Sequence, residues 1–139
     1  MIQSSITQNI ELSSKLENLA QIEQFVDDLC EQFDISEDHY GNILIALTEA
    51  VNNAITHGNQ LNPSKKVCLN MGTTLNEVEF TIKDEGNGFD FNNVPDPTLP
   101  ENIEKLSGRG IFLMKSLADD VVFEEEGTKI KLKFSLSAN

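Results

Sequence analysis

The hydrophobic period of this chain changes once, near Pro63, and that change limits the folds that the chain can adopt. Before Pro63, apolar residues recur at three- and four-residue spacing over 16–33 and again over 43–54, as in amphipathic helices. After it they alternate over 67–71 and 78–82, with a polar turn near 74–76. This alternation indicates a β-hairpin with one buried face. The chain is therefore predicted to combine helices with an antiparallel hairpin.

Short polar motifs indicate where the two helices begin and end. Ser14 and Glu17 form a capping box, in which the serine accepts a backbone hydrogen bond and the glutamate reaches back. The first helix is expected to begin there and to run to about residue 34. Ser36, followed by two acidic residues that suit the helix dipole, is expected to cap the second helix. Gly58 is placed to end that helix.

The second half of the chain carries weaker patterns. Residues 92–107 contain three prolines and little periodicity, which indicates a long mobile loop, with a short helix around 101–106, that could act as a lid. A third helix is expected from Ile111 to about Asp119, followed by two short strands at 121–123 and 129–134. Without repeats or low-complexity tails, residues 1–139 are expected to form a single domain.

Acidic residues outnumber basic ones by 23 to 10, which gives a formal net charge of −13. Such a surface repels a phosphate backbone, so nucleic acid is not an expected partner. No apolar run approaches membrane-spanning length, and the N-terminus lacks a signal-peptide pattern. We therefore expect a cytoplasmic protein with no membrane partner. Cys30 and Cys68 are far apart and are expected to be reduced.

A polar stripe interrupts the second helix. Glu49, Asn53 and His57 follow one another at four-residue spacing, so their side chains share one side of the helix. A carboxylate one turn before a carboxamide can hold a hydrated cation beside a proton acceptor. The alternative is an ordinary solvated stripe beside the core stripe. His57 is better explained as a helix-end residue that meets the C-terminal dipole than as a ligand.

Asp84 follows the second strand of the hairpin. The alternation of that strand places Asp84 on the same buried face as Val78 and Phe80. A buried carboxylate requires a partner, because burying an unpaired charge is costly. A simple strand-end cap is the competing explanation, but the glycines that follow favour a ligand.

Two glycine pairs separated by one residue occur at Gly86/Gly88 and Gly108/Gly110, and the second pair precedes the third helix. Backbone amides without side chains at a helix N-terminus form an anion site. No P-loop or Rossmann motif is present in the sequence. A calcium loop over 84–90 is rejected because Gly86 and Gly88 stand where oxygen ligands are needed.

In this order, ExxxN on a helix, DxGxG after a strand and GxG opening a later helix resemble the motifs of the GHKL ATP-binding superfamily, which includes gyrase and histidine kinases. The segments LTEAVNNAITHGN, KDEGNGFDF and SGRGIFLMKSLAD most closely resemble bacterial anti-sigma factors that are also serine kinases. The resemblance covers nearly the whole chain. It implies an α+β fold of the GHKL (Bergerat) type, a two-layer α/β sandwich with three helices on one mixed, mainly antiparallel sheet.

The resemblance also implies a role for each matching residue. Glu49 would be the general base, Asn53 would ligate Mg²⁺ that bridges the phosphates, and Asp84 would accept a hydrogen bond from the adenine amino group. The other implied nucleotide contacts are Gly86 and Gly88 at the base and ribose, Gly108, Arg109 and Gly110 around the phosphates, and Thr128 beside Asp84 at adenine.

The implied function is that of an ATP- and Mg²⁺-dependent serine kinase that sequesters a sigma factor or similar client and phosphorylates a STAS-type antagonist, as a homodimer. The alternative is a docking module in which ATP controls partner binding without phosphoryl transfer, and Glu49 argues against it. The ATPase half of a histidine kinase is disfavoured because the residues before the first capping box are too few for a phosphoacceptor hairpin. Leu106 stands where some relatives have a basic residue, so Lys105 and Arg109 both remain candidates for the γ-phosphate contact.

Overall fold

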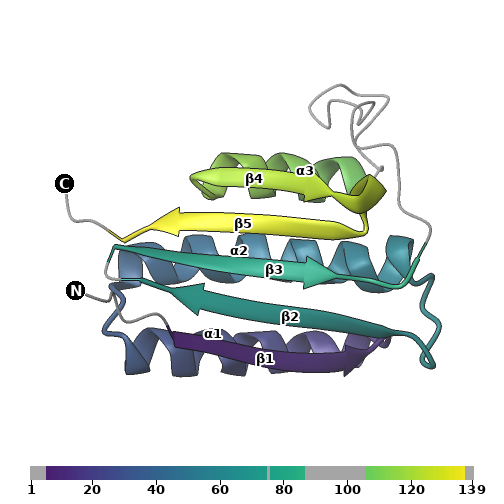
Figure 1. The fold of residues 1–139 in the computed structure, drawn as a ribbon, viewed down its shortest axis with the longest axis horizontal. Coiled ribbons are helices and arrows are strands. Elements are labelled where there is room, and N and C mark those ends of the chain that lie inside the picture. Colours follow the sequence, from purple (N-terminus) through teal and green to yellow (C-terminus); the bar gives the residue numbers. More distant parts are fainter. Residues whose placement is uncertain (1–5, 75, 87–105, 137–139) are drawn as a thin grey trace.

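The computed structural model describes residues 6–74, 76–86 and 106–136, and in this part the chain forms two layers (Figure 1). One layer is a five-stranded sheet in the order β1-β2-β3-β5-β4. The strands are β1 (Ile6–Ser13), β2 (Lys66–Thr73), β3 (Glu77–Lys83), β4 (Asp120–Glu124) and β5 (Lys129–Ser135). The other layer holds the helices α1 (Ala20–Gln32), α2 (Glu37–Asn53) and α3 (Leu106–Leu117), which lie on the same face of the sheet.

The sheet confirms the predicted hairpin and its buried face. β2 and β3 pair antiparallel, with Leu69 opposite Ile82 and Met71 opposite Phe80, and these four side chains are buried. β5 continues the same alternation beside β3. All four pairings among the described strands are antiparallel, so the parallel part of the expected mixed sheet is not found there.

The core lies between the two layers. Phe80 of β3 is fully buried and meets Phe25 of α1 and Phe134 of β5 edge to face, with ring centroids 6.4 and 6.0 Å apart. α2 lies behind the centre of the sheet, between α1 and α3 (Figure 1). Because α2 is in the middle of the helical layer, its buried side faces the sheet and its flank faces α3.

The predicted capping box is wrong. The chain is still in β1 at Ser13, and a short 3-10 helix, η1 (Leu16–Leu19), leads into α1 with Lys15 at its N-cap and no side-chain cap. Ser14 is instead fully buried, and its hydroxyl donates to the Lys65 carbonyl, 2.8 Å away. Ser14 and Glu17 match the sequence pattern of a capping box. The Ser14 hydroxyl instead bonds to a residue 51 positions away in the sequence.

The boundaries of α2 agree with those predicted, whereas the start of α3 does not. α2 begins directly after Ser36, although the Ser36 side chain makes no capping bond. A π-helical turn, η2 (Ala54–Gly58), extends α2 to the predicted end at Gly58. α3 begins at Leu106, five residues before the predicted Ile111. The lid predicted over 92–107 lies outside the described residues except for the two that open α3.

Two smaller expectations concern the cysteines and the membrane. Cys30 and Cys68 are both free, as predicted from their separation. In the part of the chain that the structure describes, no helix combines the length and the apolar character needed to cross a bilayer.

Candidate nucleotide site

Glu49 and Asn53 lie one turn apart on α2, and Gly110 of α3 lies directly against them. A Cβ atom added to Gly110 would be 2.8 Å from Glu49 Oε1 and 3.0 Å from Asn53 Nδ2. Since real Cβ atoms do not approach other atoms so closely, only glycine fits here without displacing the two side chains. The structure therefore brings together three residues that were predicted from two separate motifs.

Asn53 is almost completely buried, with 6 % of its surface exposed. Among the buried side-chain nitrogen and oxygen atoms of the described residues, its Nδ2 is the one that has no hydrogen-bond partner. A buried donor without an acceptor costs about 1–3 kcal/mol. Such a cost indicates a place where an oxygen-rich ligand supplies the missing acceptor.

A second cluster forms where η2 ends. Asp84 Oδ1 accepts a hydrogen bond of 2.8 Å from the Gly86 amide. A Cβ atom on Gly58 would lie 2.4 Å from Asp84 Oδ2, and one on Gly86 would lie 1.8 Å from the Gly58 carbonyl oxygen. Gly58 does end the helix as predicted, but it is not among the residues with positive φ. The reason for glycine here is the close approach of the 84–86 segment.

Asp84 is buried, as its strand parity predicted, with 6 % of its surface exposed. Burial is the main cause that raises the pKa of its carboxyl group, against the smaller lowering effects of the Gly86 amide, Lys83 and Lys65. A carboxylate with one amide donor and an oxygen held against Gly58 suits a ligand that brings a further hydrogen-bond donor.

Thr128 lies beside Asp84 through the backbone. Its carbonyl oxygen accepts a hydrogen bond of 2.9 Å from the Asp84 amide. Its hydroxyl donates to the Glu125 carbonyl, 2.8 Å away, in the turn before β5. The residue is thus adjacent to Asp84, as the resemblance implied, while its hydroxyl proton is used within the turn.

The predicted phosphate cradle lies at the start of α3. Because the helix begins at Leu106, Gly108 and Arg109 fall within its first four residues, whose amides have no acceptor inside the helix. Gly110 comes one position later and contributes space rather than a free amide. The Arg109 side chain, Gly88 and Lys105 lie outside what the structure describes. His57 is exposed in the last turn of the helix, at the end of η2.

Two residues of this region were not predicted from the sequence. Gly58 was assigned to helix termination alone, and Asn59 was assigned no role. Asn59 is buried and bonds to the backbone amide of Glu85, 2.7 Å away, in the same segment as Asp84. Its position directly after Gly58, at the predicted end of the helix, was the local sign that Asn59 lies at a turn. Hydrophobic periodicity carries no information about the long-range hydrogen bonds that the Asn59 side chain makes.

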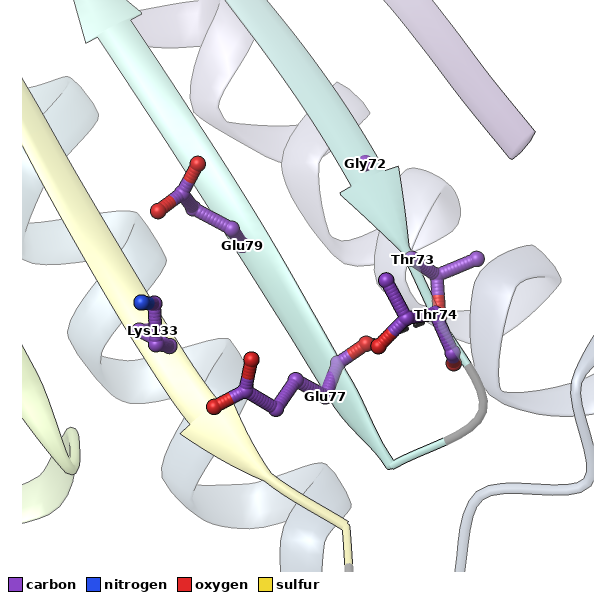
Figure 2. A pocket seen from close by; sticks show the side chains of 6 residues that line it. All are labelled: Gly72, Thr73, Thr74, Glu77, Glu79 and Lys133. Carbon is purple, nitrogen blue, oxygen red and sulfur yellow. Dashed lines mark hydrogen bonds between the residues drawn. The ribbon is translucent and has the colours of Figure 1, made fainter. Parts of the chain in front are cut away.

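A pocket elsewhere on the sheet holds none of the predicted site residues. It has a volume of about 280 Å³ and is lined by Gly72, Thr73, Thr74, Glu77, Glu79 and Lys133. Figure 2 shows that these residues gather at the turn between β2 and β3 and on the adjoining strands. That turn is at the opposite end of β3 from Asp84, about 23 Å along the strand.

Comparisons with known proteins give a matching domain family and several named relatives. The family described as the histidine kinase-like ATPase domain matches residues 12–134. The anti-sigma F factor of Geobacillus stearothermophilus is 32% identical over 130 residues, which cover 90% of this chain and 89% of that protein. The anti-sigma F factor of Bacillus subtilis is 35% identical over 111 residues, 76% of each chain.

Two longer proteins match over part of their length. The serine-protein kinase RsbW of Oceanobacillus iheyensis is 34% identical over 86 residues, 58% of this chain and 54% of that protein. The crystal structure of the RsbU and RsbW domains of Rv1364c from Mycobacterium tuberculosis superposes with a TM-score of 0.64 at 15% identity. The match covers 96% of this chain and 33% of that one, and it supports the fold.

Proposed function

This chain belongs to the family of histidine kinase-like ATPase domains, and we propose on that premise that it is an ATP- and Mg²⁺-dependent serine kinase. Its protein substrate would be a STAS-type antagonist, and its client a sigma factor or similar protein. The relatives named anti-sigma F factor and serine-protein kinase RsbW support this combination.

The observation that carries the proposal is the arrangement of two clusters along α2 and η2. Glu49 and Asn53 lie against Gly110 at one cluster, and Gly58 lies against Asp84 and Gly86 at the other. Gly58 follows Glu49 by nine positions, which is about 13 Å of helix. A nucleotide lying along this helix would place its base at Asp84 and its phosphates near Gly110 and the first amides of α3.

The residues at the phosphate end fit Mg²⁺. The Asn53 amide supplies one oxygen, and its buried nitrogen needs an acceptor that a phosphate oxygen would provide. Mg²⁺ is often held by one or two protein oxygens together with substrate phosphates and water. Bound there, the ion would neutralise charge on the phosphates during transfer.

Glu49 would act as the general base. Its carboxylate oxygen lies beside Gly110, within reach of the same space as Asn53. In the proposed reaction the serine Oγ forms a bond to the γ-phosphorus while the bond to the ADP oxygen breaks. The serine proton passes to the Glu49 carboxylate.

Labelled ATP and a STAS-type protein encoded beside this chain provide the test. The wild type should transfer label to a serine, and Glu49→Gln should reduce transfer by at least about a hundredfold while it still binds ATP. Glu37→Gln is the matched control, because the same change on the exposed first turn of α2 should leave transfer unchanged.

Two results would contradict the proposal. If the wild type binds Mg-ATP and its partners but transfers no label, the chain is a docking module controlled by ATP. If it does not bind ATP at all, the nucleotide assignment itself is wrong.

A further inference from the structure

Asn59 is the residue that follows η2, and its side chain is buried with 1 % of its surface exposed. Its Oδ1 accepts a hydrogen bond of 2.7 Å from the Glu85 amide. Its Nδ2 donates to Ser14 Oγ at 2.9 Å and to the Lys66 carbonyl at 3.0 Å. The amide therefore satisfies both of its ends inside the protein.

These bonds join four segments that are distant in the sequence. Ser14 follows β1, Lys66 opens β2, Glu85 follows β3, and Asn59 itself follows the helix. Ser14 is in turn fixed by its own hydroxyl bond to the Lys65 carbonyl. The amide of Asn59 is thus held by the ends of two neighbouring strands, and it holds the segment that continues from the third.

The segment that Asn59 holds is the one that carries Asp84. The Asp84 amide donates to the Thr128 carbonyl at 2.9 Å, and the next amide, that of Glu85, donates to Asn59. The Gly86 amide then bonds to the Asp84 carboxylate. Since the peptides before and after Asp84 are both fixed, the direction of its side chain is fixed as well.

We infer that Asn59 is a positioning residue that sets the selectivity of the site for adenine, acting through Glu85 on Asp84. The inference rests on the proposed function, because it assumes that Asp84 faces a nucleotide base. Asn59 itself is buried and bonds to the Glu85 amide, so its effect on Asp84 passes through that segment. Without its Oδ1, the Glu85 amide loses its acceptor, and the Asp84 carboxylate, then held only by the Gly86 and Thr128 bonds, is oriented less firmly.

The test compares ATP with inosine triphosphate, which carries a carbonyl where adenine carries its amino group. A carboxylate held in place favours ATP, because it accepts from the amino group and repels the carbonyl. The ATP preference is the dissociation constant for inosine triphosphate divided by that for ATP. In Asn59→Ala this ratio should fall about tenfold, towards unity. Dissociation constants are measured by calorimetry on the folded variants.

Asn18→Ala is the matched control. Asn18 also anchors the end of β1, through a bond of 2.8 Å from its Nδ2 to the Ser13 carbonyl. Among the described residues, its side chain hydrogen-bonds to Ser13 and Gln21, and not to the 84–86 segment. It should lower stability and leave the ATP preference intact. If Asn59→Ala does not fold, Asn59→Ser carries the same test, because its hydroxyl is too short to reach the Glu85 amide.

The outcomes separate the inference from the proposed function. If the wild type prefers ATP and the Asn59 variant keeps the same preference, Asn59 is only structural and the inference fails while the kinase proposal stands. If the wild type binds neither nucleotide, the proposed function fails, and the inference fails with it. A preference lost in the Asn59 variant and kept in Asn18→Ala supports the inference and the nucleotide site on which it rests.

Discussion

At the scale of single residues, the arrangement around Asp84 favours ligand binding over stability. The carboxyl group is buried, and burial raises its pKa although the Gly86 amide, Lys83 and Lys65 act in the opposite direction. The folded chain therefore holds the proton of Asp84 more tightly than the unfolded chain does. A buried charge of this kind is retained at functional sites, where stability gives way to activity.

The pH dependence of Asp84→Asn follows from the sign of that shift. Because the pKa in the folded state is above the unfolded value, the wild type loses stability as the pH rises from the ordinary aspartate range, about 4, through the raised pKa. The neutral isostere avoids this loss. We expect Asp84→Asn to be more stable than the wild type at pH 7, with the difference shrinking towards pH 4.

Urea unfolding at several pH values measures this difference, and ATP binding gives the functional counterpart. The variant should bind ATP about ten- to a hundredfold more weakly, since it loses a charge-assisted hydrogen bond. A variant that is less stable than the wild type at pH 7, or a difference independent of pH, would contradict the argument.

At the scale of elements, Gly41 and Gly110 occupy positions within helices for different reasons. Gly41 lies in α2 with nothing within 4 Å of the position a Cβ atom would take, so no close contact requires a glycine there. Gly110 lies in α3, where a Cβ atom would press on Glu49 and Asn53. Glycine has the same low helix propensity at both positions, but only at Gly110 do neighbouring side chains leave no room for a Cβ atom.

Alanine at each position should therefore have opposite consequences. Gly41→Ala should raise the free energy of unfolding by about 0.5–1 kcal/mol and leave ATP binding unchanged. Gly110→Ala gains the same propensity but displaces the Glu49 carboxylate and the Asn53 amide, and Mg-ATP affinity should fall at least about tenfold. Denaturant titration and calorimetry on both variants check this, and equal affinities would show that the α2–α3 contact does not shape the site.

At the scale of the whole molecule, the net charge of −13 lowers the stability of the folded state, because acidic groups repel one another in a compact chain. Half-exposed ion pairs such as Lys83 with Glu125 offset little of it, because water and salt screen them. The wet face of the sheet carries the alternating Lys129, Lys131 and Lys133, opposite the buried side of β5. The exposed positions of α1 include the acidic residues Glu23, Asp27, Asp28 and Glu31.

Salt should therefore stabilise this protein. Raising NaCl from about 0.01 to about 0.15 M shortens the Debye length from about 30 to about 8 Å and weakens the repulsion among acidic groups. The urea midpoint should rise with an unchanged slope. Glu31→Lys, on the exposed side of α1, should show a smaller salt effect because it removes part of that repulsion. A midpoint that falls with salt in both proteins would mean that attractive pairs dominate.

Local patterns in the sequence determined most elements and part of the site. Alternation within β3 was sufficient to predict that Asp84 is buried, because side-chain direction in a strand depends only on parity. The four-residue spacing of Glu49 and Asn53 on α2 was equally local. The family resemblance carried the motif assignments, and the matched family confirms the membership.

Tertiary structure decided the roles that depend on contacts between distant segments. Ser14 has the local sequence pattern of a helix cap. In the folded chain it is buried near the start of β2, where its hydroxyl bonds to Lys65 and Asn59. Gly58 ends a helix, but the approach of Gly86 is what requires a glycine there. Periodicity reports which face of an element is buried, and it cannot report which residue of another element will lie against that face.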